Sequence, residues 1–141
     1  MTIRISSQQM DAFKADRIER FIDNLVPHLQ ECFPEACEEL GEQDTRAVVR
    51  YGIDLAESYG IDREWCVCEF IDLMFVFGVE FDRDPELPWA SEILQDETIQ
   101  EQGALLDHLW QAGLESIENQ AQQQLLSSDV NFNLPDIQMP S

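Results

Sequence analysis

Residues 62–78, which read DREWCVCEFIDLMFVFG, are the part of the chain that most restricts its fold. On a helix this segment is apolar around almost its whole circumference, and Glu69 and Asp72 form a narrow polar strip beside Trp65. Such a helix must be covered by other elements on most of its sides. A strand of a parallel sheet is the competing interpretation, but no alternation of strands and helices surrounds the segment. We therefore expect the central helix of an all-α bundle.

The segment before it has the spacing of an amphipathic helix. Ser6 or Ser7 can cap a helix that runs to about residue 32. One side of this helix gathers the apolar residues Phe13, Ile18, Phe21, Ile22, Leu25 and Leu29. Phe33-Pro34 interrupts the pattern because the residue before a proline avoids the helical region. Residues 35–40 can then form one short extra turn before Gly41.

A second amphipathic helix is predicted from Asp44 or Thr45 to Gly60, where a left-handed residue can end it. Its buried side consists of Val48, Tyr51, Gly52, Leu55, Ala56 and Tyr59. The other side carries charged residues at spacings that allow exposed ion pairs within the helix, namely Arg46, Arg50, Asp54 and Glu57.

The pattern changes after Gly78. Residues 79–91 contain two prolines and should form a loop, and a last helix should run from about Asp96 to Gln123. Its buried side would be Leu106, Leu109, Trp110, Gly113 and Ile117. Residues 127–141 have no helical period, so we expect a flexible acidic tail after a bundle domain of residues 1–126. The predicted fold is a single-domain, all-α bundle of four main helices with a short extra helical turn and this tail.

Charge restricts the partners of the chain. It has 29 acidic residues against 8 Lys and Arg, which gives a formal net charge of −21. Arg83 is the last basic residue, and residues 84–141 hold eleven acidic residues and no Lys or Arg. Such a field repels nucleic acids and anionic membranes and attracts basic proteins. We therefore expect a protein partner with a basic surface, no nucleic acid and no membrane; the sequence does not predict the oligomeric state.

The location of the protein follows from what its sequence lacks. The N-terminus has no basic segment followed by an apolar run, and no stretch of roughly 18 apolar residues occurs, so we expect a cytoplasmic protein. Four cysteines, Cys32, Cys37, Cys66 and Cys68, lie in or beside apolar helical stretches. They lack the dense spacing of a secreted disulfide scaffold, so free thiols are expected.

The residue patterns that support catalysis or metal binding are weak. His28 and Cys32 are one helical turn apart and Cys37 follows, but this spacing fits no established zinc site and a fourth ligand is missing. Glu69 and Asp72 can have raised pKa values suited to acid–base chemistry, or can simply pair with neighbouring arginines. We predict a protein that is not an enzyme, with no catalytic residue, no metal and no cofactor.

The segment FDRDPELPWASEIL, residues 81–94, has a different character. Its alternating acids resemble the oxygen ligands of a calcium loop, but the glycine and the bidentate glutamate that such a loop needs are absent. An acidic turn here would present apolar residues from a loop, and aromatic residues on loops are good interface anchors. The alternative is that the tryptophan folds back onto the core. The predicted protein-binding residues are Asp82, Asp84, Glu86, Leu87, Pro88 and Trp89.

Three parts of the sequence carry a resemblance. Ile5-Ser6 with Gln9-Met10 and Phe13, then Phe33-Pro34, and above all FIDLMFVFGVEFDRDPELPWA resemble a group of small accessory proteins encoded beside spike, tip and effector genes of bacterial type VI secretion systems. The resemblance covers roughly residues 1–95. It implies a cytoplasmic adaptor or chaperone that loads a secreted effector, with an immunity protein that neutralises a cognate toxin as the alternative.

Overall fold

The computed structural model describes the backbone of residues 7–132 and the side chains of residues 15–125. Within residues 7–132 the chain forms helices and turns and has no strand, so the all-α class predicted from the sequence is confirmed. No helix of this described part has the length and apolar character needed to cross a bilayer. The helices group into two compact units, Met1–Phe81 and Asp82–Ser141, and each is described by itself.

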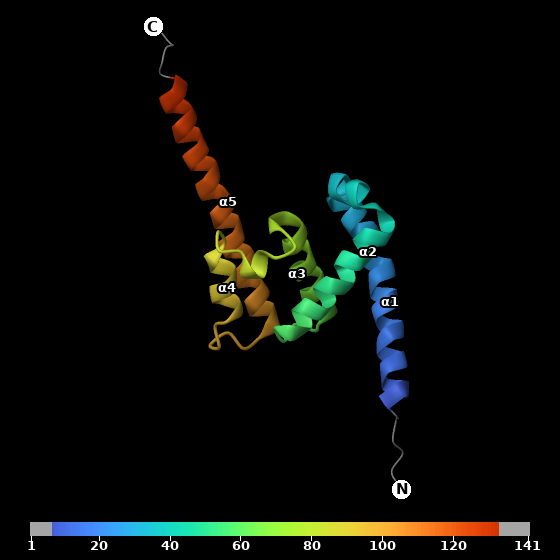
Figure 1. The fold of residues 1–141 in the computed structure, drawn as a ribbon. Coiled ribbons are helices and arrows are strands. Elements are labelled where there is room, and N and C mark those ends of the chain that lie inside the picture. Colours follow the sequence, from blue (N-terminus) through green and yellow to red (C-terminus); the bar gives the residue numbers. More distant parts are fainter. Residues whose placement is uncertain (1–6, 133–141) are drawn as a thin grey trace. The chain divides into compact units, whose positions relative to one another are not determined.

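The first unit contains three helices: α1 (Ser7–Cys32), α2 (Pro34–Ser58) and α3 (Glu64–Phe77). As Figure 1 shows, α1 and α2 run side by side, and α3 contacts both of them. The sequence predicted α3 as the central helix of one bundle; within this unit α3 packs mainly on α2 and to a smaller extent on α1. Its apolar side chains are buried together with those of the other two helices, among them Ile22, Leu25 and Leu29 of α1, Val49 and Ala56 of α2, and Phe70, Ile71, Leu73 and Met74 of α3.

The connection between α1 and α2 follows the prediction made from Phe33-Pro34. Phe33 has φ −132° and ψ 63°, outside the helical region, and Pro34 is the first residue of α2. The ring of Phe33 stacks on that of Phe75, with the centroids 5.4 Å apart. The break between the helices is thus held against α3 by an aromatic contact.

A second break lies inside α2 at Gly41, where φ is 82° and ψ is 164°. This left-handed φ favours glycine because it has no Cβ. The short helical turn predicted before Gly41 is therefore confirmed. Helical backbone resumes directly after Gly41, not at Asp44 or Thr45 as predicted, and Thr45 is fully buried.

The faces of α2 and α3 approach each other closely at Gly52. A Cβ atom at this position would lie 2.8 Å from Cγ1 of Ile71 and 2.9 Å from Sδ of Met74. Real Cβ atoms essentially never come so near a heavy atom. Gly52, predicted on the buried side of this helix, therefore sets the spacing between α2 and α3.

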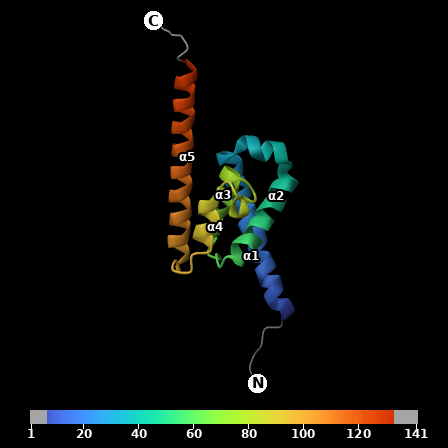
Figure 2. The ribbon, with the colours of Figure 1, turned by 60° about the vertical axis from the view of Figure 1, so that its left-hand side comes forward.

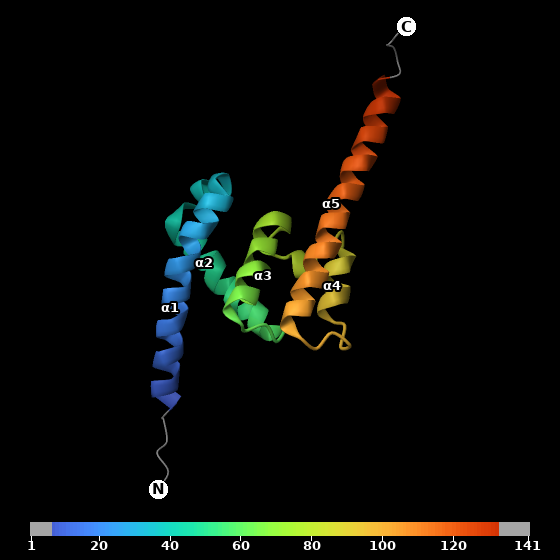
Figure 3. The ribbon, with the colours of Figure 1, turned by 180° about the vertical axis from the view of Figure 1, so that it is seen from behind.

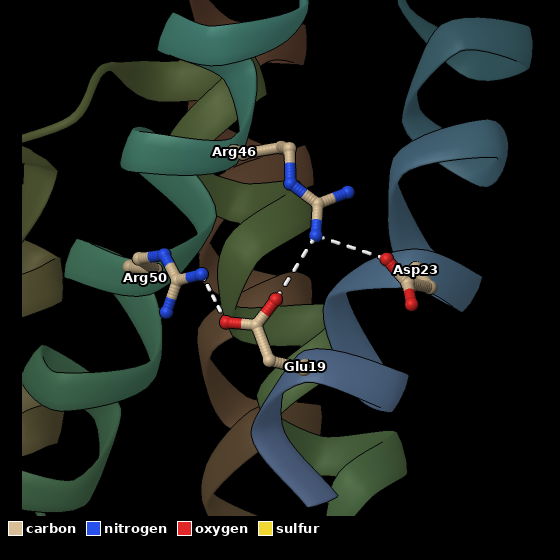
Figure 4. A network of polar contacts seen from close by, with 4 residues as sticks. All are labelled: Glu19, Asp23, Arg46 and Arg50. Atoms are coloured by element: carbon tan, nitrogen blue, oxygen red, sulfur yellow. Dashed lines mark hydrogen bonds and ion pairs between the residues drawn. The ribbon is translucent and has the colours of Figure 1, made fainter. Parts of the chain in front are cut away.

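Ion pairs join the other side of α2 to α1 (Figure 4). One nitrogen of Arg46, Nη2, lies 3.2 Å from Oε1 of Glu19 and 2.9 Å from Oδ1 of Asp23. Arg50 pairs with the second carboxylate oxygen of Glu19. The sequence predicted pairs within α2 for these two arginines, whereas in the structure both reach across to α1.

The second unit contains α4 (Pro88–Leu94) and α5 (Gln102–Phe132), which pack against each other (Figure 2). The prediction of a loop over residues 79–91 is wrong in two places. A 3₁₀ turn, η1, spans Phe81–Arg83, and α4 begins at Pro88. Proline ends a helix that precedes it but is favoured in the first helical turn, where its missing N–H has no partner to lose.

The long helix α5 also differs from its predicted bounds. It begins at Gln102, and the residues predicted as its start form a turn instead, in which Oδ1 of Asp96 accepts hydrogen bonds from the backbone N and the hydroxyl of Thr98. Oε1 of Glu101 accepts a hydrogen bond from the N–H of Ala104 and so caps the first turn. Residues 127–132, the start of the predicted tail, are helical. The remainder of the predicted tail, residues 133–141, lies outside the described residues.

Candidate protein-binding site

The predicted protein-binding segment begins with a buried residue. Asp82 lies in η1, and its side chain is 0% exposed. Nε of Arg83, which is itself exposed, is 3.9 Å from Oδ2 of Asp82. This carboxylate therefore does not belong to the surface that a partner would meet.

The next two acids form the turn that leads into α4. Oδ1 of Asp84 accepts a hydrogen bond of 2.9 Å from the backbone N of Glu86, and its carbonyl oxygen accepts one of 2.9 Å from the N–H of Leu87. Asp84 and Leu87 are half-buried, whereas Glu86 and Pro88 are exposed. Of the predicted residues, Glu86 and Pro88 are thus the most accessible.

Trp89 is not on a loop. It is the second residue of α4, half-buried, with its Nε1 atom inside the molecule. The loop predicted over residues 79–91 from its two prolines is therefore wrong at this position, because Pro88 is the first residue of a helix. A contact between Trp89 and a partner protein stays a prediction.

A different set of polar side chains meets in the first unit, at the contact between α1 and α3. Nε2 of His28 lies 3.2 Å from Oδ1 and 3.3 Å from Oδ2 of Asp72. Sγ of Cys32 lies 3.8 Å from Nδ1 and 3.9 Å from Nε2 of the same ring. These three residues form a Cys–His–Asp cluster: His28 and Cys32 belong to the zinc pattern considered in the sequence, and Asp72 to the pair of carboxylates on α3.

The geometry of this cluster does not suit nucleophilic catalysis. A base takes a proton along the lone pair of one ring nitrogen, but Sγ of Cys32 is almost equally far from both nitrogens of His28. Burial raises the pKa of Asp72, while the contact with His28 opposes this rise. Burial first, and then the nearby Asp72, raise the pKa of Cys68 to about 11, so this thiol is neutral at pH 7.

Metal binding finds no support in the described side chains. Among residues 15–125, no group of three or more His, Cys, Asp and Glu side chains is placed to hold a metal ion. Cys37, the third residue of the zinc pattern considered above, is buried. All four cysteines are free thiols.

An exposed apolar surface that the sequence did not predict lies on α5. Leu114, Ile117 and Leu125 are 56%, 43% and 64% exposed, and Ala121 between them is exposed as well. We call these four residues the α5 stripe. Leu106, Leu109 and Gly113 are buried as predicted, but Ile117 is not. The signal in the sequence is that apolar residues continue to recur at intervals of three and four residues beyond Gly113, up to Leu125.

Comparison with known proteins adds no relative: no family model matches the chain, and neither curated proteins nor solved structures give a significant match.

Proposed function

We propose that this chain is an acidic protein-binding accessory protein that acts as an adaptor or chaperone for an effector of a bacterial type VI secretion system. The observation that carries the binding role is the one-sided charge of the second unit. Residues 84–141 contain eleven acids and no Lys or Arg. Eight acids from α4, α5 and the adjoining turns are exposed: Glu86, Glu92, Asp96, Glu97, Glu101, Asp107, Glu115 and Glu118.

This charge favours one class of partner. A surface with one sign of charge speeds encounter with the opposite sign and rejects partners of the same sign. A basic effector would therefore associate quickly with the second unit, and added salt would slow that association. The choice of a secretion effector as partner comes from the resemblance of residues 1–95.

An immunity protein is the second candidate, and the same exposed acids favour it. Toxins that act on nucleic acids contact the phosphates with Lys and Arg, and an acidic protein can pair with these residues in place of the phosphates. The two roles differ in what becomes of the toxin. An adaptor leaves a folded effector able to act and also contacts the secretion spike, whereas an immunity protein blocks the active site.

The test is to produce the chain together with the effectors and spike proteins encoded near its gene. For an adaptor we expect a complex with one effector, a further contact with a spike protein, and undiminished effector activity in the purified complex. For an immunity protein we expect loss of toxin activity and no spike contact. A failure to bind any of these proteins at low salt would contradict both roles.

A matched pair of variants tests the part played by charge. Replacing Glu115 and Glu118 by Gln removes two exposed charges from α5, and replacing Asp54 and Glu57 by Asn and Gln removes two from α2. We expect the first pair to slow association with the effector more than the second, because charge near the contact steers encounter most strongly.

A further inference from the structure

α4 covers only the first part of α5. With a rise of about 1.5 Å per residue, the seven residues of α4 span about 10 Å, whereas the 31 residues of α5 span about 46 Å. In Figure 3, α5 accordingly continues well past the end of α4. Every residue from 117 to 125 is exposed. This part of α5 has no neighbour among the described residues of its own unit.

The α5 stripe has the dimensions of a helix-pairing surface. Its four members, Leu114, Ile117, Ala121 and Leu125, follow one another at intervals of three, four and four residues. At about 100° per residue they lie within an arc of about 80°. A core-facing surface of a helix is wider, at about 100° or more, while a narrow seam is typical of pairing with one other helix.

A neighbour would also stabilise this part of α5. Residues 114–132 contain no Gly or Pro and are rich in Gln and Leu, which favour a helix. Even so, most helices in proteins are stabilised chiefly by the packing of an apolar face and not by helix propensity. Covering the α5 stripe supplies such a contact.

The charged residues beside the α5 stripe indicate whether a second copy of the chain or another protein covers it. Glu118 borders the stripe on one side, and Glu115 lies beyond Glu118 on that same side. Gln120 and Gln124 lie on the other side of the stripe. Pairing with the same helix of a second copy would bring these acids together, and no Lys or Arg follows Arg83 to offset them. In paired helices the residues beside the seam set the choice of partner.

We infer that the α5 stripe binds an amphipathic helix of another protein, one whose apolar seam is flanked by Lys or Arg. This inference rests on the proposed protein-binding function and adds the surface and the chemistry of the partner. The seam supplies the desolvated contact, and Glu115 and Glu118 pair with the basic residues beside it.

The probe is a labelled synthetic peptide of about three heptads with Leu at the a and d positions and Lys at e and g. A control peptide carries Glu in place of Lys. The chain is compared with the variant Leu114→Gln, Ile117→Gln and Leu125→Gln, which keeps the charge and the helix propensity of α5. A matched variant, Asn119→Ala with Gln123→Ala, changes exposed residues on the opposite side of the helix. Circular dichroism checks that each variant is folded.

Fluorescence anisotropy should show that the wild type binds the Lys peptide at least ten times more tightly than the triple variant does. The opposite-side variant should bind like the wild type, and the Glu peptide should not bind. Equal affinity of the wild type and the triple variant for the Lys peptide would overturn the inference. A wild-type dimer that the triple variant loses and the Lys peptide does not disrupt would show that a second copy covers the stripe, and would also overturn it.

The proposed function can fail separately. If the effector binds the triple variant as tightly as the wild type, the effector uses another surface and the inference fails while the function stands. If no effector binds the wild type but the peptide results are as expected, the α5 stripe binds basic helices and the secretion role is wrong.

Discussion

Nε2 of His28, on α1, lies 3.2 Å from Oδ1 of Asp72, on α3, and this polar contact joins two helices that also bury apolar side chains. The side chain of Asp72 is 20% exposed and that of His28 is 40% exposed. A carboxylate in such a position loses much of its hydration, which disfavours the charged form. The contact with the histidine stabilises the charged form again in part.

Asp72 should make the stability of the chain depend on pH. Burial raises its pKa in the folded state, so the native chain holds this proton at a higher pH than the unfolded chain, whose ordinary Asp pKa is about 3.9. The contribution of Asp72 to the free energy of unfolding therefore falls as the pH rises from about 3.9 through the raised value. Relative to the wild type, Asp72→Asn should gain stability over this range and level off above it.

Urea unfolding of the wild type and Asp72→Asn at a series of pH values measures this difference. Asp54→Asn, at an exposed position of α2, removes the same formal charge and serves as the control. A difference between Asp72→Asn and the wild type that does not vary with pH would show that burial of Asp72 is not linked to folding.

The four thiols should react in a definite order. Cys32 is exposed, Cys37 and Cys66 are buried, and the pKa of Cys68 is raised to about 11. Because the thiolate is the reactive form and must be accessible, iodoacetamide should modify Cys32 first in the native chain. Peptide mass spectrometry at increasing reaction times gives the order. Early modification of Cys68 would contradict its burial beside Asp72.

Replacing Thr45 by valine should stabilise the folded chain. Its Oγ1 atom is buried and has no hydrogen-bond partner among the described residues. A buried hydroxyl without a partner costs about 1–3 kcal/mol, so Thr45→Val should raise the free energy of unfolding by about 1 kcal/mol. Thr45→Ser keeps the hydroxyl and removes a methyl group, and should lower it by about 1 kcal/mol. A loss of stability in Thr45→Val would mean that a water molecule bonds to the hydroxyl.

Gly52→Ala should destabilise the chain although alanine favours helices. The gain in helix propensity is about 1 kcal/mol, but the new Cβ would meet Ile71 and Met74 at under 3 Å. Overpacking of this kind typically costs about 1–3 kcal/mol, so we expect a net loss in the free energy of unfolding. The same substitution in an Ile71→Ala background should cost less stability. A double-mutant cycle tests this by thermal unfolding of the wild type, the two single variants and the double variant. Equal costs in both backgrounds would exclude a clash with Ile71.

Trp89→Ala should lower the free energy of unfolding by about 2 kcal/mol, since half of a large side chain loses its packing in α4. Pro88→Ala, at the exposed first position of the same helix, should change it little. Differential scanning calorimetry compares the two. If Trp89→Ala unfolds like the wild type but releases the effector at least ten times faster, Trp89 is an interface anchor and not part of the core.

The helices of the first unit could be predicted because local signals mark them. The apolar period marks their buried sides, Phe33-Pro34 and Gly41 mark the breaks, and Gly60 and Gly78 follow the ends of α2 and α3 with positive φ. The ion pairs could not be predicted. Arg46 and Arg50 have carboxylates within reach in their own helix, and only the tertiary packing brings Glu19 closer.

The second unit was harder to predict for two physical reasons. Pro88 is compatible with both a loop and the first turn of a helix, and the loop predicted over residues 79–91 left no room for the start of α4. Ile117 follows the buried residues of α5 in period, but α4 is too short to reach it. An apolar period shows which side of a helix can be buried and says nothing about how far along the helix a neighbour extends.

Glu19 forms ion pairs with two arginines at once (Figure 4). Arg46 and Arg50 lie one turn apart on α2, and each contacts a different oxygen of the Glu19 carboxylate. In evolutionary terms the three positions are epistatic: a change at residue 19 alters the effect of every change at residues 46 and 50. Relatives of this chain that lack an acid at position 19 should therefore have lost Arg50, whereas Arg46 keeps its ion pair with Asp23.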